Sequence, residues 1–582
     1  MLLLLAGGTV YDPRHGVRGA VRDLWIRDGR IVAAPSDPTE RPDRTIDLTG
    51  YVVMPGGIDL HCHIAGPKVN TARKMRPEEK RDPASRVLRT ERLRSGSLGS
   101  VPSTFATAYK YLAMGYTTAF DAAVPPLAAR HAHEEFDDTP AIDKGFFALV
   151  GNNHFAMRAI RDGDRARLDA FLGWLLNAAK AYAPKLVNPG GVELWKQRFD
   201  GNATGLDDLV DGFDVTPRDI VREIAASANR IGLPHPVHIH TNRLGLPGNW
   251  RTTLDTMRTL DGLRAHLTHI QFHSYDGGDE DESTFGSKVA PLAAWVNAHP
   301  ELTVDVGQVL FGETTSMTGD GPLGHYLSRL YGTKWFSGDV EMEAGCGIAP
   351  IRYRDTSLVH ALQWAIGLEW YLLVDDPWQI AMSTDHPNGG SFMAYPEIVR
   401  LLMDRAYRDE TIARLPPQVR ERSVLADLKR EYSLEEICII TRAAPARMLG
   451  LDRKGHLGGG ADADITVYLP DGNRRRMFEM PRWVFKEGRI LIEDGEIRDV
   501  IDGATLHVDV PYDRSIEAPV EQWFDEAYSV RFRNYPVADD ELHRATPVKA
   551  GAGPIPIAGR SDVTPATSPN GERRRSAEES EG

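Results

Sequence analysis

The chain has 582 residues, a mass of 64.5 kDa and a net charge of −14, from 68 Lys+Arg against 82 Asp+Glu. This length exceeds one small module and allows several domains or one large barrel with additions. The acidic balance makes nucleic acid and anionic membranes unfavourable partners, and no apolar run approaches the ~20 residues that span a bilayer. The three cysteines are far apart and form neither a disulfide framework nor a CxxC motif, so we expect a cytoplasmic protein.

Short β-segments occur near both ends of the chain. Near the N-terminus, Asp28-Gly29 separates two apolar segments within 21–32 and predicts a hairpin. Near the C-terminus, 463–469 is a strand candidate, and 483–492 turns at Gly488. We therefore predict one small composite β-domain, built from residues 1–54 and from part of 436–545.

Between these ends, residues 55–435 alternate short apolar runs with helical stretches. Eight runs are candidate strands: 55–63, 117–122, 146–150, 183–187, 237–240, 267–271, 302–309 and 379–385. Eight buried strands separated by helices match an α/β fold of the (β/α)8 TIM-like barrel type, although a doubly wound open sheet alternates in the same way.

Two features mark the C-terminal part. Ser433 and Glu436 form a capping box that opens a helix before the second β-segment. Residues 546–582 are rich in Pro, Gly, Ser and Ala and end in a charged run, a composition that cannot bury a core. We predict a disordered tail over 546–582.

The first predicted strand ends in His61-Cys62-His63. Because side chains alternate along a strand, His61 and His63 point to one face and Cys62 to the other. Two imidazoles ~7 Å apart on one strand can bind the same metal ion. Two unrelated polar residues at a strand end are the alternative.

Later predicted strands also end in polar side chains. Lys185 lies in an apolar run, where a lysine is costly unless it is paired, snorkels to the surface or is modified. Carboxylation by CO₂ would convert it into an anionic ligand. On the next strand we favour His238 as a metal ligand and His240 as a substrate contact.

The sixth and eighth predicted strands carry the remaining candidate site residues. Of His266, His269 and His273 we choose His269, which lies in the most strand-like part. Asp385, at the end of the eighth strand, fits a metal ligand, a general base or a turn residue. The candidates follow strands one, four, five, six and eight, at the ends where barrels carry their active sites.

This order of HxH, Lys, His, His and Asp is similar to the amidohydrolase superfamily with a binuclear metal centre. The flanking segments 8–12, 28–32, 47–56 and 458–467 resemble the β-domain signatures of its cyclic-amide hydrolases. Longer motifs resemble one family, the A subunits of formylmethanofuran dehydrogenases and of formyltransferase/hydrolase complexes. These motifs lie at 61–70, 187–192, 267–275, 305–308, 339–345 and 384–390, and the resemblance covers roughly residues 1–545.

The resemblance implies a cofactor and a catalytic group. It implies two Zn²⁺ ions per subunit, with carboxylated Lys185 as the bridging ligand and Asp385 as the catalytic carboxylate. The implied metal ligands are His61, His63, Lys185, His238 and His269.

The resemblance also implies a reaction. It is the reversible hydrolysis of the N-formyl amide of formyl-methanofuran or formyl-methylofuran to formate and the free amine, an aminomethylfuran with a glutamate-rich tail. The other subunits of a complex of one-carbon metabolism are the implied protein partners. The Arg-rich composition and the tail favour a formyltransferase/hydrolase complex over a CO₂-reducing dehydrogenase.

Two further alternatives are a dihydropyrimidinase-like cyclic amidohydrolase and an inactive scaffold. The long motifs argue against the first. The presence of all six metal-site residues argues against the second.

The segment from Lys68 to Arg94 holds ten basic and four acidic residues. Because it leaves the first strand beside the HxH motif, we expect a basic mouth that attracts a polyanionic tail, although a solvated helix face explains the later arginines. The predicted substrate contacts are Lys68, Asn70, Arg73, Asn188, His240, His273 and Asn388. The Gly-rich segment 311–345 is either a lid or a partner contact.

Overall fold

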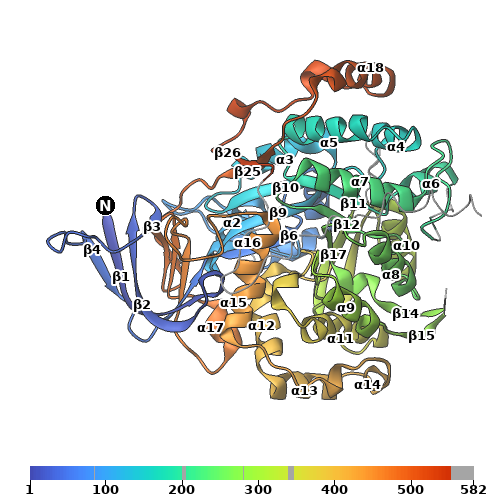
Figure 1. The fold of residues 1–582 in the computed structure, drawn as a ribbon. Coiled ribbons are helices and arrows are strands. Elements are labelled where there is room, and N and C mark those ends of the chain that lie inside the picture. The colour runs from blue at the N-terminus through green and yellow to red at the C-terminus, as the bar shows by residue number, and fades with distance from the viewer. Residues whose placement is uncertain (84–85, 199–202, 204, 279–280, 338–346, 552–582) are drawn as a thin grey trace, which may run out of the picture.

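The computed structural model describes residues 1–83, 86–198, 203, 205–278, 281–337 and 347–551. Figure 1 shows a central barrel surrounded by helices, with a β-sheet domain at one end and helix α18 (Glu517–Ala527) on the outside. Within the described ranges, no helix is both long and apolar enough to cross a membrane.

Eight parallel strands form the barrel. They are β6 (Gly57–Cys62), β9 (Tyr116–Val124), β10 (Asp143–Leu149), β11 (Ala183–Val187), β12 (Val237–His240), β13 (Ala265–Leu267), β16 (Leu302–Asp305) and β20 (Ile380–Ala381). Each pairs in parallel with the next. A parallel bridge between Cys62 and His386 closes the circle. The closed barrel confirms the predicted (β/α)8 architecture and excludes the open sheet.

The sixth strand differs from its prediction. It covers Ala265–Leu267, whereas the sequence predicted 267–271. His269 adopts a left-handed backbone with φ of 34°, and a short 3-10 turn, η5 (Ile270–His273), follows. A left-handed residue cannot continue a strand, so the chain turns at His269.

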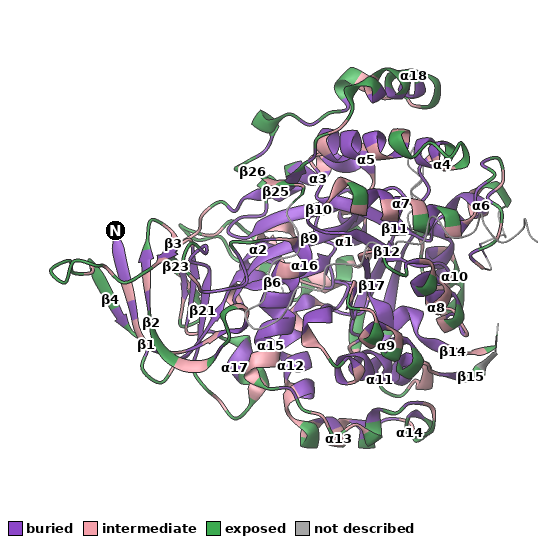
Figure 2. Ribbon diagram, viewed as in Figure 1, coloured by how far each residue is buried: buried purple, intermediate pink, exposed green. Residues whose placement is uncertain are grey.

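Helices cover the outside of the barrel, with their buried faces inward and their exposed faces outward (Figure 2). In α7 (Pro217–Ile231) the apolar residues Ile220, Val221, Ile224 and Ala228 recur at helical spacing and are buried. The other long covering helices are α2 (Thr104–Ala113), α3 (Ala129–Asp137), α4 (His154–Arg161), α5 (Arg165–Ala179), α8 (Trp250–Thr259), α9 (Val289–Ala298), α11 (Leu358–Leu373) and α12 (Tyr395–Met403).

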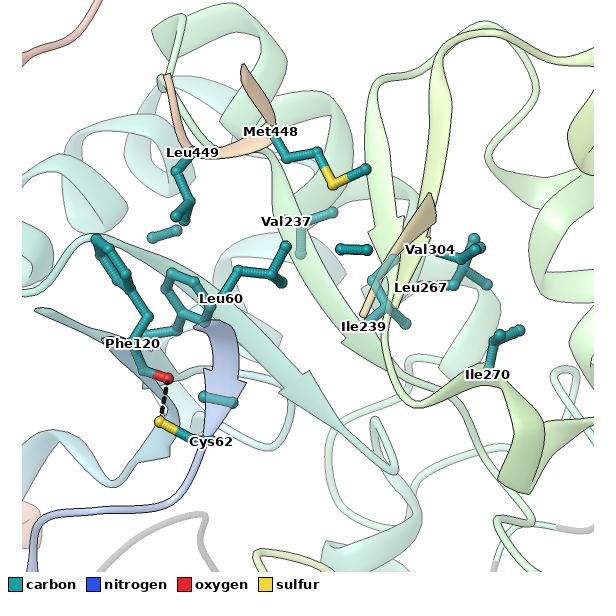
Figure 3. Close-up of a cluster of buried hydrophobic side chains, with 14 of the residues drawn as sticks. Leu60, Cys62, Phe120, Val237, Ile239, Leu267, Ile270, Val304, Met448 and Leu449 are labelled. Carbon is teal, nitrogen blue, oxygen red and sulfur yellow. Dashed lines mark hydrogen bonds between the residues drawn. The ribbon is translucent and has the colours of Figure 1, made fainter. Parts of the chain in front are cut away.

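Apolar side chains from several strands pack together between the barrel and its helices. Figure 3 shows this cluster with Leu60, Phe120, Ile239 and Val304, all of them buried. The Cys62 thiol donates to the carbonyl oxygen of Phe120 over 3.2 Å. Cys62 is therefore a packing residue in this cluster.

Strands from both chain ends form one nine-stranded sheet. They are β1 (Leu2–Asp12), β2 (Val17–Arg27), β3 (Arg30–Val32), β4 (Arg44–Asp47), β5 (Val52–Pro55), β21 (Ile465–Tyr468), β22 (Trp483–Lys486), β23 (Arg489–Glu493) and β24 (Glu496–Ile497). The antiparallel pairing of β5 with β21 joins the two halves. Both predicted hairpins are present, β2–β3 at Asp28-Gly29 and β22–β23 at Glu487-Gly488. Positive φ at these four residues suits tight hairpin turns.

Buried ion pairs connect the sheet domain to the barrel. Lys486 Nζ on β22 lies 2.7 Å from Asp143 on β10 and 2.8 Å from Asp464. Lys454 Nζ lies 2.5 Å from Asp143 and 2.9 Å from Asp464. Because a buried charge without its partner is costly, these contacts specify one arrangement of sheet and barrel.

The predicted tail begins too early. Residues 546–549 belong to β26 (Ala545–Lys549), which pairs in parallel with β25 (Thr505–Asp509), and β25 in turn pairs with β10. These residues form a strand because the edge of β25 is available for backbone pairing. Composition alone does not reveal such a pairing. The rest of the predicted tail, 552–582, lies outside the described residues.

Candidate metal centre

A pocket opens at the C-terminal ends of the barrel strands and encloses about 960 Å³, its open mouth included. Polar side chains from five different strands meet there. They are His61, His63, Lys185, His240, His269 and Asp385. Five of the six predicted metal-site residues therefore reach one pocket.

Both histidines of the HxH motif contact the same carboxylate oxygen. His61 Nε2 lies 2.9 Å and His63 Nε2 3.1 Å from Oδ1 of Asp385. The ligand atoms of His61, His269 and Asp385 lie within 4.8 Å of one another. Imidazole nitrogens and carboxylate oxygens are zinc ligands, so this donor set fits the predicted metal.

Lys185 is buried at the same pocket. Its Nζ has no hydrogen-bond partner among the described residues. Burial lowers the pKa of Lys185 to about 7, although Asp305 and Asp385 oppose this shift. The neutral amine is the form that reacts with CO₂, so the lowered pKa of Lys185 favours carboxylation.

The two histidines of β12 lie at different depths. Lys185 is in register with His238, whereas His240 pairs with Val187 and lies two residues, or about 7 Å, nearer the mouth. His240 lines the pocket, and His238 lies below it. His238 Nε2 is 2.9 Å from His61 Nδ1, and the two form a second potential metal group with Asp305.

Asn388, like His240, is a predicted substrate contact that lines the pocket. Its backbone N–H donates to the carbonyl oxygen of Asp385 over 2.6 Å. Its side-chain Oδ1 accepts from the backbone N–H of Met317 over 2.7 Å. Asn388 therefore holds the turn that carries Asp385, which has a left-handed φ of 50°.

Asn188 and His273 lie behind the pocket surface. The Asn188 amide donates to Asp320 over 3.1 Å and accepts from Asn242 over 2.8 Å. His273 Nδ1 is hydrogen-bonded to Thr241 Oγ1 over 2.8 Å, and its ring stacks on His269 at 5.2 Å. Both support the pocket from behind, and neither is among its lining residues.

The structure does not bring the predicted basic mouth to the pocket. Arg73, on α1 (Pro67–Met75), donates to Glu135 over 2.8 Å and to the carbonyl oxygen of Ile64 over 3.1 Å. Lys68 is buried and donates to a backbone carbonyl over 2.6 Å, and the Asn70 amide contacts a histidine ring. Because α1 packs inward, these side chains bind the protein itself, and none of the three lines the pocket.

The pocket walls are mainly apolar. Part of the wall comes from β17 (Gly312–Thr318), α10 (Gly321–Tyr331) and β19 (Gly347–Tyr353). Among its apolar side chains are Leu244, Phe272, Phe285, Tyr326, Leu330 and Tyr353. The described part of the predicted lid or partner segment, 311–337, therefore contributes to this wall, and residues 338–345 lie outside the described ranges.

Sequence reasoning missed two carboxylates on barrel strands, Asp305 on β16 and Asp121 on β9. Asp305 accepts hydrogen bonds from Thr268 Oγ1 over 2.6 Å and from His266 Nε2 over 3.0 Å. Asp121, on β9, lies 3.6 Å from His63 Nδ1 and is buried. The available signal for both was a carboxylate within an apolar predicted barrel strand, 117–122 for Asp121 and 302–309 for Asp305.

Comparisons with known proteins agree with this geometry. The amidohydrolase family matches residues 44–491. Protein FwdA of Methanocaldococcus jannaschii is 42% identical over 578 residues, covering 95% of this chain and 100% of that protein. The A subunit of the formyltransferase/hydrolase complex Fhc of Methylorubrum extorquens is 38% identical over 557 residues, covering 93% of this chain and 97% of that protein. The crystal structure of the FhcABCD complex from Methylorubrum extorquens with methylofuran contains a chain that superposes with a TM-score of 0.87 at 36% identity, covering 95% of this chain and 100% of that one.

Proposed function

The chain belongs to the amidohydrolase family, in the group that contains FwdA and the A subunit of Fhc, and from this premise we propose its reaction and substrate. It hydrolyses, reversibly, the N-formyl amide of a formylated aminomethylfuran coenzyme to formate and the free amine. The observation that carries the proposal is the similarity to one chain of a complex solved with methylofuran, which extends over 95% of this chain and all of that one.

Two zinc ions are the proposed cofactor, and the residues present fit them. Five side chains would hold the metals, with Asp385 completing the site: His61, His63, carboxylated Lys185, His238 and His269. Lys185 Nζ supports this because it is buried without a hydrogen-bond partner among the described residues. When bound, zinc supplies polarisation of the formyl carbonyl and a lowered pKa for water.

Asp385 is the proposed proton carrier. Its carboxylate takes a proton from the attacking water and returns it to the nitrogen of the leaving amine. The contact between the Asn388 backbone N–H and the Asp385 carbonyl oxygen holds this carboxylate at the pocket floor. The apolar walls limit water and suit an aromatic ring.

The chain is proposed to act as one member of a larger assembly, as its relative does in the FhcABCD complex. The same hydrolytic reaction would serve a formyltransferase/hydrolase complex or a CO₂-reducing dehydrogenase. Purification from the native host, followed by identification of the co-purifying subunits and their metals, distinguishes these two assemblies.

The test is formate release from a formylated aminomethylfuran, measured beside ring opening of dihydrouracil. We expect formate release alone, and Asp385→Asn should reduce its rate by roughly 10²–10⁴-fold. Hydrolysis of dihydrouracil in place of the formamide would overturn the substrate assignment. Full activity of Asp385→Asn, or an active chain that holds no zinc, would overturn the mechanism.

A further inference from the structure

The hairpin of β17 and β19 contacts the turn after β20 at three points. The Tyr353 hydroxyl, on β19, donates to the Asn388 carbonyl oxygen over 3.1 Å. The backbone N–H of Met317, on β17, donates to Asn388 Oδ1 over 2.7 Å. Thr314, also on β17, donates from its hydroxyl to the Pro387 carbonyl oxygen. Asn388 is therefore held through both its backbone and its side chain.

One of these contacts decides which way the Asn388 amide points. A backbone N–H can only donate, so the amide atom that faces Met317 must be the oxygen, Oδ1. The amide nitrogen, Nδ2, is then directed away from that N–H. Within the described ranges Nδ2 donates to no protein group, and the Asn388 side chain lines the pocket and is only partly buried. Nδ2 therefore offers its N–H donors to the pocket.

This donor lies beside the proposed proton carrier. The Asn388 backbone N–H bonds the Asp385 carbonyl oxygen over 2.6 Å, and both residues line the pocket. The proposed substrate would bring two oxygen acceptors into this region. One is the formyl oxygen at the bond to be cleaved. The other is the furan ring oxygen, which is separated from the amide nitrogen by a methylene group and a ring carbon.

We propose that Asn388 Nδ2, oriented by the Met317 N–H, donates a hydrogen bond to an oxygen of the formylated aminomethylfuran head of the substrate. The proposal rests on the proposed function, because it needs that substrate. It adds to that function a named donor atom and the class of group that this atom recognises. A donor that is already oriented loses little side-chain freedom when the substrate binds, which favours binding.

Two substitutions separate the donor from the structural role of Asn388. Asn388→Asp keeps an oxygen for the Met317 N–H but removes the Nδ2 donors. Asn388→Ala removes the oxygen as well. We expect both variants to lose activity on the formylated coenzyme to a similar extent. Wild-type activity in Asn388→Asp, together with a loss in Asn388→Ala, would reduce Asn388 to a structural role and overturn the proposal.

Three small substrates identify the accepting oxygen and control for the charge that aspartate adds. N-formylfurfurylamine has both oxygens, N-formylbenzylamine lacks the ring oxygen, and N-thioformylfurfurylamine carries sulfur, a weak acceptor, in place of the formyl oxygen. Release of the free amine is measured for each. If the ring oxygen accepts, Asn388→Asp raises KM for the furan formamide by roughly 5–10-fold and leaves KM for the benzyl compound unchanged. If the formyl oxygen accepts, kcat falls by roughly 10²–10³-fold, and this loss shrinks on the thioformyl compound.

An equal loss on all three compounds would overturn the proposal, because neither oxygen would then accept from Asn388. Wild-type KM and kcat in Asn388→Asp would overturn it as well. Should Asn388→Ala not fold, Asn388→Asp and the three compounds decide the question alone. If the wild type cleaves neither these compounds nor the formylated coenzyme, the proposed function fails and the donor assignment fails with it.

Discussion

Cys62 on β6 and His386 after β20 form the parallel bridge that closes the barrel, and the backbone N–H of His63 donates to the His386 carbonyl oxygen over 2.8 Å. This closure brings the first and last barrel strands together. It places the His61 ring 2.9 Å from the carboxylate of Asp385, although the two residues are 324 positions apart. The metal centre therefore depends on barrel closure.

Lys185→Ala should lower the zinc content of the purified chain, because the proposed bridging ligand is removed. Zinc is measured by elemental analysis after dialysis, and the bridging carboxylate by carbon-13 labelling with bicarbonate. Lys144→Met is the matched control, since Lys144 is also buried on a barrel strand but donates to the Thr139 carbonyl oxygen over 2.6 Å. Equal zinc in the two variants would rule out Lys185 as a ligand.

Leu330→Asp should raise KM for the coenzyme substrate by roughly five- to ten-fold. The reason is that the substitution removes apolar contact with the substrate worth about 1–1.5 kcal/mol of binding free energy. Leu330 is half exposed on α10 and lines the pocket. Leu469→Asp, at an exposed leucine just after β21 in the sheet domain, is the control and should leave KM unchanged. An unchanged KM for Leu330→Asp would mean that the substrate does not contact this wall.

Arg73→Met should lower the free energy of unfolding by about 3 kcal/mol, because the buried carboxylate of Glu135 loses its ion-pair partner. KM should stay unchanged, because Arg73 does not line the pocket. Denaturant unfolding measures the first quantity and steady-state kinetics the second. Arg89→Met, an exposed arginine of the same basic segment, should change neither. A raised KM with unchanged stability would restore the basic mouth expected from sequence.

Glu369→Gln should remove a pH dependence of stability. Burial raises the pKa of Glu369 from 4.5 to about 7, although hydrogen bonds from Ser287 and from the Val424 N–H oppose the shift. Because the folded-state pKa lies above the unfolded value, folding takes up a proton between these pH values. Stability is therefore lost as pH rises from about 4.5 to about 7, by at most about 3 kcal/mol.

The comparison of Glu369→Gln with the wild type at two pH values tests whether stability falls as pH rises. The variant should be the more stable chain at pH 8, and the difference should shrink at pH 5. Thermal unfolding in matched buffers measures both. A difference that does not change with pH would show that the Glu369 carboxyl is ionised throughout in the folded state.

Much of the architecture could be predicted from local sequence. Period-2 alternation, eight apolar runs and turn signals such as Asp28-Gly29 depend on neighbouring residues, so they predicted the barrel and both hairpins. The spacing of His61 and His63 predicted a shared face in the same way. Polar residues at the ends of the predicted strands gave the candidate ligands, and the family resemblance then assigned their roles.

The depth of each side chain in the barrel and the partner of each buried charge could not be predicted, because both depend on contacts between segments far apart in sequence. His238 and His240 share one face of β12, and only the stagger of the barrel strands places His240 at the pocket and His238 beneath it. The sequence predicted that Arg73 belongs to a basic mouth, whereas in the structure Arg73 forms an ion pair with Glu135. The order of residues along the chain limits which side chains can meet at the strand ends. Barrel closure and helix packing select among them, because these long-range contacts set the depth of each side chain and give each buried charge its partner.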